Sequence, residues 1–257
     1  MDISNLKLKG NSFYTLEVRN SNNPLVLKYS PNYDERLLKS AFKQANFKSD
    51  YFEKPTITYI DESKEKTAFE MKFIQGNSFV EFFLNASKND LDTLIEKLRG
   101  YFRERIKTEQ IINIKTFHTK LDELDAKGYA WTLPNISGIK MYGGECHGDM
   151  TFSNMIFSDK FYLIDFLDSY IESPTMDLVK LRQDTHLFYS LNMMKQSNVD
   201  RTKIKTGLNY IDEWIVSNYE IEHYKSLQTI NLLRIKPYAD KPLQEYLTKM
   251  INQLWQL

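Results

Sequence analysis

Residues 144–166 read GECHGDMTFSNMIFSDKFYLIDF, and this stretch decides how the rest of the chain is interpreted. Its second half contains two apolar runs, Met155 to Phe157 and Phe161 to Ile164. They flank the short polar segment Ser158-Asp159-Lys160, a pattern that is typical of a β-hairpin. The stretch therefore predicts a non-helical island, of about residues 142–175, in the part of the chain after Gly76, which is otherwise mostly helical.

The register of this hairpin decides which polar side chains meet at its open end. If the loop is the two-residue pair Asp159-Lys160, Met155 faces Ile164 and Asn154 faces Asp165. Directly opposed residues of a hairpin have β-carbons roughly 4.5–5.5 Å apart. An amide oxygen and a carboxylate at that distance suit a hard cation such as Mg²⁺, which also takes phosphate and water oxygens.

Asp149 lies on the segment that enters the hairpin, five residues before Asn154. A carboxylate in that place lies beside the metal without binding it, where it can orient a hydroxyl nucleophile and accept its proton. Taken singly, Asp149 also fits a turn or helix-cap acid, and Asn154 fits a turn amide. The spacing of His147, Asp149, Asn154 and Asp165 together favours phosphoryl transfer.

Outward from this stretch, the first 75 residues alternate between β-branched or aromatic runs and turn residues. They predict three strands, one helix and two strands. The expected ranges are Leu6 to Leu8, Phe13 to Val18, Leu25 to Tyr29, Tyr33 to Phe47, Thr56 to Ile60 and Thr67 to Phe73.

After Gly76 the apolar residues recur mainly at helical spacing. The predicted helices include one that begins near Asn89 and Asp90, and others at roughly 104–126, 176–195, 201–218, 221–235 and 242–255. The fold class is therefore α+β. We expect a bilobal chain, with a small β-rich N-terminal lobe at 1–75 and a larger, mostly helical C-terminal lobe at 76–257.

Composition excludes several function classes. The chain of 257 residues has 34 Lys and Arg against 34 Asp and Glu, so it lacks the basic excess that drives nucleic-acid binding. The single cysteine, Cys146, cannot form an internal disulfide. No stretch of 18 residues is free of charge, and no secretory signal is visible. We expect a cytoplasmic protein that binds neither nucleic acid nor membrane.

Residues 145–178 resemble the aminoglycoside phosphotransferase and choline kinase family of the protein-kinase-like superfamily. His147-Gly148-Asp149 resembles the His-Gly-Asp form that this family uses where protein kinases have His-Arg-Asp. Ile164-Asp165-Phe166 resembles the metal-binding Asp followed by an aromatic residue, and Ser173 to Leu178 resembles Asp-Pro-x-x-Asp-Leu. The resemblance implies a bilobal protein-kinase-like fold.

The resemblance also implies roles for individual residues. Asp149 is expected to be the catalytic base, and Asn154 and Asp165 are expected to hold Mg²⁺. His147 is expected to brace the catalytic loop. Asp177 fits two interpretations equally, a brace of that loop or an acid in the first turn of a helix capped by Ser173.

In the N-terminal lobe, Lys28 ends the run Leu25-Val26-Leu27-Lys28, which resembles the Val-Ala-Ile-Lys strand of kinases. The resemblance implies that Lys28 contacts the nucleotide phosphates; the alternative is an exposed lysine at a strand end. Its expected partner is a glutamate on the following helix. Glu35 is the candidate, although it follows Lys28 closely, and Asp34 is the alternative.

Two further segments occupy nucleotide-binding positions in the resemblance. Residues 9–13 stand where kinases have the phosphate-covering loop, so Asn11 and Ser12 are expected to contact phosphate. Residues 70–76 resemble the connection between lobes, and adenine is expected to hydrogen-bond to the backbone near Lys72 and Ile74. The alternative for this segment is an edge strand that ends in a turn.

The expected function is an ATP- and Mg²⁺-dependent phosphotransferase that acts on a hydroxyl of a small molecule, a sugar or an amino alcohol. GTP is the alternative phosphate donor. Gly148, in place of the kinase arginine, and the short segment from Asp165 to Asp177 argue against a protein substrate. A nucleotidyl (AMP) transferase and a catalytically silent nucleotide-binding module on the same fold remain alternatives.

Overall fold

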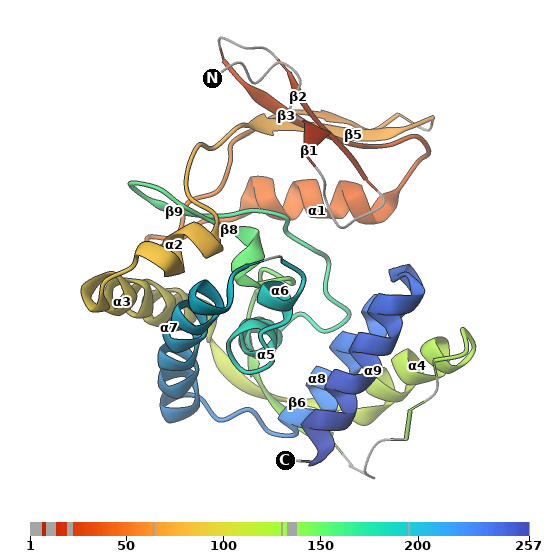
Figure 1. Cartoon of the computed structure of the whole chain (residues 1–257). Helices are drawn as coiled ribbons and strands as arrows, with labels where there is room; N and C mark the ends of the chain where they lie inside the picture. Colours follow the sequence, from red (N-terminus) through yellow and green to blue (C-terminus); the bar gives the residue numbers. More distant parts are fainter. Residues whose placement is uncertain are drawn as a thin grey trace. The chain divides into compact units, whose positions relative to one another are not determined.

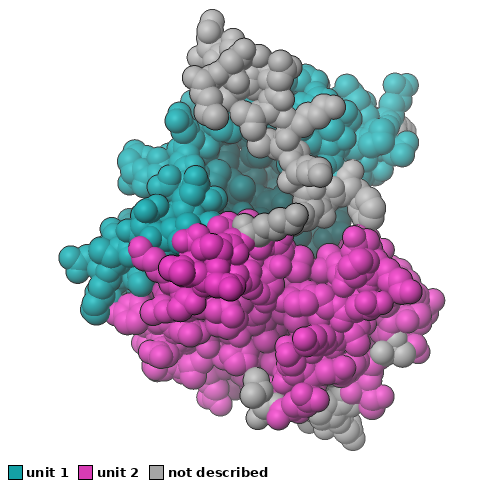
Figure 2. Space-filling model, in the orientation of Figure 1, with its two compact units in different colours: residues 1–104, 147–170 teal, residues 105–146, 171–257 magenta. Residues whose placement is uncertain are grey.

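The computed structural model describes residues 7–8, 14–19, 23–63, 65–129, 131–132, 138–194 and 196–256. The chain forms two compact units, each built from two separate segments (Figure 2). Unit 1 comprises residues 1–104 and 147–170, and unit 2 comprises residues 105–146 and 171–257. The units therefore do not divide the chain at residue 75, where the sequence pattern changes, because the hairpin segment 147–170 belongs with the N-terminal segment.

Unit 1 contains a five-stranded antiparallel sheet with the order β1-β2-β3-β5-β4. The strands are β1 (Lys7–Leu8), β2 (Thr15–Arg19), β3 (Leu25–Ser30), β4 (Ile57–Asp61) and β5 (Thr67–Lys72). The three-strand, helix, two-strand order predicted from the sequence is confirmed, with ends displaced by one or two residues. The displacement is expected, because strand ends are set by pairing partners rather than by local residue preference.

Helix α1 (Glu35–Asn46) covers one face of this sheet (Figure 1). Asp34 caps its first turn, since the Asp34 side chain accepts a hydrogen bond from Leu37 N at 2.9 Å. Leu37 and Ala41 lie on the buried side of the helix and belong to one apolar cluster with residues of β3 and β5. That cluster also contains Val26, Phe69 and Met71, and it fixes which way α1 faces the sheet.

The other elements among the described residues of unit 1 are two helices and the hairpin segment. They are α2 (Phe79–Asn85), α3 (Lys88–Arg105), the 3₁₀ turn η1 (Phe152–Asn154), β8 (Met155–Phe157) and β9 (Phe161–Leu163). The hairpin is joined to the N-terminal segment by main-chain hydrogen bonds at two places. Glu53 N donates to Phe161 O at 2.9 Å, and Asn77 exchanges two hydrogen bonds with Phe157, at 2.7 and 3.0 Å.

Unit 2 is mostly helical and contains one small sheet. Its elements are β6 (Thr108–Asn113), α4 (Ile114–Asp125), β7 (Gly138–Gly143), α5 (Pro174–Thr185), α6 (Tyr189–Asn192), α7 (Asn198–Asn218), α8 (Tyr224–Ile235), the 3₁₀ turn η2 (Lys236–Tyr238) and α9 (Lys241–Gln256). The prediction of one helix over 104–126 is wrong, because β6 pairs with β7 in an antiparallel ladder and separates α3 from α4. Non-local pairing outweighs the local helical pattern here.

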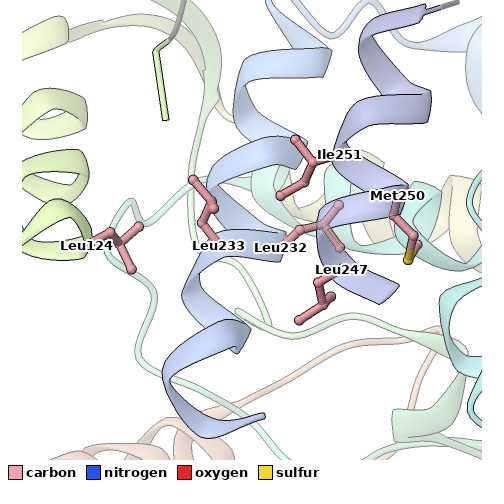
Figure 3. Close-up of a cluster of buried hydrophobic side chains, with 6 residues drawn as sticks. All are labelled: Leu124, Leu232, Leu233, Leu247, Met250 and Ile251. Carbon is pink, nitrogen blue, oxygen red and sulfur yellow. The ribbon is translucent and has the colours of Figure 1, made fainter. Parts of the chain in front are cut away.

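One apolar cluster of unit 2 joins α4, α8 and α9 (Figure 3). Leu232 and Leu233 of α8 are completely buried, as are Leu247 and Ile251 of α9. Leu124 contributes the contact from α4. Among the described helices, none combines the length and the hydrophobicity needed to cross a lipid bilayer.

Candidate active site

The hairpin that carries the candidate site has a register one residue away from the predicted one. Residues Met155–Phe157 pair with Phe161–Leu163, so Ser158-Asp159-Lys160 forms a three-residue loop. The predicted pairing of Asn154 with Asp165 is therefore wrong. The physical reason lies in the turn, since Asp-Lys lacks the glycine that stabilises a two-residue hairpin loop.

Asp165 lies just beyond the paired part of the hairpin. Ile164 N donates to Asn154 O at 3.0 Å, which is the last hydrogen bond before Asp165 along this strand. Asp165 itself has a φ of 64°, in the left-handed region that Asp and Asn adopt more readily than other non-glycine residues. Its side-chain direction is therefore set by this backbone conformation and not by strand alternation.

Lys28 of β3 forms an ion pair with Asp165, from Lys28 Nζ to Asp165 Oδ1. The Lys28 side chain is 4% exposed, whereas that of Asp165 is 37% exposed. The Nζ atom also lies 5.1 Å from the centre of the Tyr14 ring, within the range of a cation–π contact. The alternative interpretation of Lys28, an exposed lysine at a strand end, is wrong.

Asn154 holds Asp149 at two points. Its Nδ2 donates to Asp149 Oδ2 at 2.9 Å and to Asp149 O at 2.8 Å. Thr151 N donates to the same carbonyl oxygen at 2.8 Å, so a tight turn follows Asp149. The orientation of the Asp149 carboxylate is thus fixed by the residue predicted to bind the metal.

His147 is completely buried behind Asp149. Its Nδ1 accepts a hydrogen bond from Asp149 N at 3.2 Å, so the Nε2 atom, 3.0 Å from Ile164 O, carries the proton of the neutral ring. Burial lowers the pKa of His147 to about 4, and the nearby positive charge of Lys43 acts in the same direction. A neutral His147 links the Asp149 segment to the strand that leads into Asp165.

Gly148 permits a close approach between the segment His147 to Asp149 and the segment after Asp165. Its φ is +91°, a conformation that residues with a side chain rarely adopt. A Cβ atom at this position would collide with Leu167 O. Leu167 N donates to His147 O at 3.1 Å, so the two segments are also joined by a main-chain hydrogen bond.

Lys43, which the sequence pattern does not single out, also contacts the segment after Asp165. Lys43 Nζ donates to Leu167 O at 3.0 Å. In the sequence, Lys43 is a cation in the last turn of an amphipathic helix, a common and unspecific feature. Only the tertiary structure brings it to Leu167, because 124 residues separate the two.

Neither predicted carboxylate partner of Lys28 is placed beside it. Glu35 is exposed and pairs with Lys39 one turn later, at 3.1 Å. Asp34 caps helix α1 and accepts a hydrogen bond from Tyr14 Oη at 3.2 Å. The predicted pairing of Lys28 with Glu35 or Asp34 is therefore wrong, and Lys28 pairs with Asp165 instead. Glu35 is exposed to solvent, and the Asp34 side chain is used to cap the helix.

One of the two backbone positions predicted to contact adenine, Lys72, already has its N–H hydrogen-bonded within unit 1. Lys72 N donates to Thr56 O, and Phe73 N donates to Pro24 O, both at 2.9 Å. The main-chain N–H of Lys72 is therefore engaged in the sheet and is not a donor to adenine, whereas Ile74 stays a prediction. The predicted phosphate contacts Asn11 and Ser12 lie outside the described residues.

Asp177 lies in unit 2, in the first turn of α5. Ser173 caps this helix by accepting a hydrogen bond from Thr175 N at 3.1 Å, and Pro174 occupies the first helical position. Asp177 is completely buried, whereas an acid that only stabilises the first turn of a helix can remain exposed to solvent. Its expected role as a brace of the catalytic loop stays a prediction.

Two oxygen-bearing side chains of the site, those of Asn154 and Asp165, could hold a magnesium ion. Among the described residues, no group of three or more His, Cys, Asp and Glu side chains is arranged to bind a metal ion. Asn154 and Asp165 would thus supply two oxygen ligands, with phosphate and water oxygens completing the shell, as is usual for Mg²⁺. Asn154 Nδ2 already donates to Asp149, so its Oδ1 is the atom suited to a cation.

Comparison with solved structures identifies the architecture. A candidate fructosamine-3-kinase from Haemophilus somnus 129PT aligns over 97% of this chain and 90% of its own, with a TM-score of 0.59 and 12% identity. The chain has a protein-kinase-like fold. A choline/ethanolamine kinase family protein from Mesorhizobium loti aligns over 98% of this chain and 86% of its own, with a TM-score of 0.52 and 14% identity.

An aminoglycoside phosphotransferase in ternary complex with AMP-PNP and hygromycin B shares the protein-kinase-like fold as well. It aligns over 97% of this chain and 92% of its own, with a TM-score of 0.53 and 10% identity. No family model and no curated protein sequence matches the chain. The identities are low, so the similarity defines the fold, and the function has to be argued from the site.

Proposed function

We propose that this protein is an ATP- and Mg²⁺-dependent phosphotransferase that transfers the γ-phosphoryl group to a hydroxyl of a small molecule. The observation that carries the proposal is the arrangement of two acids in unit 1: Asn154 holds Asp149, and Lys28 holds Asp165. Phosphoryl transfer needs a base for the acceptor and countercharge for the phosphates, and little other covalent chemistry. These four side chains supply both.

In this proposal Asp149 orients the acceptor hydroxyl and takes its proton. Asn154 Nδ2 keeps the carboxylate in one orientation, and His147 Nδ1 accepts the Asp149 main-chain N–H, so the base is held at both ends. Such a fixed geometry lowers the barrier by positioning the hydroxyl in line with the phosphorus atom. A general base of this kind contributes typically 10²–10⁴-fold to the rate.

Lys28 and Asp165 have linked roles. A bound Mg²⁺ would neutralise phosphate charge and would take oxygen ligands from Asn154 and Asp165. Lys28 Nζ, which is held by Asp165 Oδ1 in this structure, would then donate to phosphate oxygens. Because Lys28 is almost completely buried, its charge acts in a medium of low dielectric constant and is little screened by salt.

A small acceptor fits the segment after Asp165. Residues 166–173 lead directly to the first residue of α5, Pro174. Protein kinases place a long regulatory loop at this point, and its anchoring arginine stands where this chain has Gly148. The fold is shared with enzymes described as fructosamine, choline or aminoglycoside kinases, which supports a sugar or amino-alcohol acceptor.

The test is a panel of sugars, amino alcohols and aminoglycosides incubated with Mg²⁺ and γ-labelled ATP, and parallel reactions with GTP. Mass spectrometry of the acceptor should show the gain of one phosphoryl group, and Asp149→Asn should slow this gain by about 10²–10⁴-fold. A gain of AMP would replace the proposal with nucleotidyl transfer. Metal-dependent nucleotide binding without any modified acceptor would indicate a silent binding module.

A further inference from the structure

The buried side chains of helix α1 form no ion pair with the predicted nucleotide-binding residue Lys28. The buried residues of α1 are Leu37, Ser40, Ala41 and Gln44. None of these four carries a carboxylate for Lys28, and Gln44 Nε2 donates instead to Pro55 O at 3.0 Å. The Lys28 ammonium group pairs with Asp165, which does not belong to α1.

Lys43 provides a different connection from the last turn of α1. Its Nζ donates to Leu167 O at 3.0 Å, two residues beyond Asp165. A hydrogen bond from a charged donor is stronger than one between neutral groups. The acceptor is a main-chain carbonyl, so the bond restrains the backbone that follows Asp165 whatever the residue at 167.

Leu167 is in turn attached to the catalytic loop. Its N–H donates to His147 O at 3.1 Å, and Gly148 lies so close to Leu167 O that a Cβ atom there would collide with it. On the preceding residue, the Phe166 ring packs against His147 and Phe47, with centroid distances of 4.3 and 4.9 Å. The Leu167 carbonyl is thus a junction between α1, the catalytic loop and the segment after Asp165.

We propose that Lys43 is a positioning residue, which fixes the main chain at Leu167 so that the Asp165 carboxylate is held where Mg²⁺-nucleotide binds. This inference rests on the proposed function for its ligand but not for its geometry. Lys43 touches neither substrate nor metal in this proposal. It acts through Leu167 and replaces a carboxylate on the inward face of α1 as the tie between this helix and the site.

The test compares Lys43→Met with two other variants. Met keeps most of the aliphatic stem but removes both the charge and the donor. Lys43→Arg keeps a cationic donor and should restore most of the wild-type behaviour. Lys39→Met is the matched control, since Lys39 lies one turn earlier on α1 and its Nζ is 3.9 Å from Asp168 Oδ2, so this change removes an equal charge near the same segment.

The first readout needs no ligand. Hydrogen–deuterium exchange of the peptide that covers residues 163–170 should be faster in Lys43→Met, by about tenfold, and unchanged in Lys39→Met. The second readout is the Mg²⁺ concentration that half-saturates binding of a fluorescent ATP analogue, which should rise by about tenfold in Lys43→Met alone. Equal exchange and equal Mg²⁺ requirement in the two Met variants would overturn the proposal.

The two arms also separate this inference from the proposed function. If the wild-type protein binds no nucleotide at any Mg²⁺ concentration, the proposed function fails, and the exchange measurement still decides the role of Lys43. If Lys43→Met does not fold, Lys43→Gln keeps a shorter, uncharged donor. Slower exchange in Lys43→Arg than in Lys43→Gln is then the expected result, and equal exchange would contradict the role.

Discussion

Lys28 Nζ donates to Asp165 Oδ1 and joins two residues that are 137 positions apart in the sequence. The two partners have different surroundings, because the Lys28 side chain is 4% exposed and that of Asp165 is 37% exposed. Removing one partner therefore differs in its effect from removing the other. A buried ammonium group without its carboxylate has no access to water, whereas a half-exposed carboxylate can be solvated.

We expect Asp165→Asn to lower the free energy of unfolding by about 2 kcal/mol in the absence of ligands, since it leaves Lys28 buried without a counterion. Asparagine suits the left-handed backbone at this position, so the change tests charge and not backbone strain. Lys28→Met should cost less than about 1 kcal/mol, because Asp165 can turn to water. Urea unfolding of the two variants measures this difference, and an equal or reversed order would contradict the assigned asymmetry.

For Asp149→Asn, we expect kcat with the identified acceptor to fall by about 10²–10⁴-fold, as befits the loss of a general base. Nucleotide affinity should stay within about twofold of the wild-type value, because Asp149 is proposed to contact the acceptor and not the nucleotide. Asp159→Asn, in the exposed loop of the same hairpin, is the control and should leave both quantities unchanged. Near-wild-type kcat in Asp149→Asn would remove Asp149 from the role of base.

His147 predicts a dependence of stability on pH. Its pKa is lowered to about 4 in the folded chain, against about 6.5 in the unfolded chain, so between these values the unfolded state binds more protons. The contribution of His147 to stability is therefore complete above about pH 6.5 and is lost as the pH falls towards 4. The total effect is about 3 kcal/mol.

The measurement is the free energy of unfolding of the ligand-free protein at pH 7 and at pH 4.5. His147→Gln serves as the control, because glutamine does not titrate in this range and can still accept a hydrogen bond. We expect the loss of stability between the two pH values to be smaller in the variant by about 2–3 kcal/mol. The same loss in both proteins would show that His147 is not the group responsible.

Gly148→Ala is expected to be strongly destabilising, for two reasons that can be separated. The backbone conformation, with φ at +91°, costs about 1–2 kcal/mol for a residue with a side chain. The added Cβ would also displace Leu167 O, at a further cost of about 1–3 kcal/mol.

Gly128→Ala isolates the first of these two costs. Gly128 has a similar φ of +82°, but nothing lies within 4 Å of a Cβ atom built there. We expect it to lose only about 1–2 kcal/mol in chemical denaturation. If Gly148→Ala were no worse than Gly128→Ala, the close approach to Leu167 would have no energetic importance.

Much of the fold was predictable because its signals are local. Strands, turns and α1 in the first 75 residues follow from residue type and spacing, and so does the clustering of Asp149 with Asn154 only five residues later. The helix expected over 104–126 failed, because β6 forms through pairing with β7, a distant segment. Local preference carries no information about such a partner.

The same distinction explains the errors at the site. A one-residue change in the hairpin loop altered every cross-strand pair, and the sequence does not determine loop length sharply. The resemblance points to Glu35 as the carboxylate partner of Lys28, but packing against the sheet decides which side chains α1 buries. Lys43 was missed because its acceptor is a main-chain oxygen, which no residue pattern marks.

The division of each unit into two separate segments affects how the chain folds during synthesis. When the first 104 residues have left the ribosome, the main-chain groups of Glu53 and Asn77 still lack their partners in β8 and β9, which belong to residues 147–170. Unit 1 is therefore completed only after the first segment of unit 2 has been translated. In a nascent chain that stalls between residues 104 and 147, the main-chain groups that bond to the hairpin in the complete protein stay unpaired and exposed. Such a chain would be a substrate for chaperones and proteases.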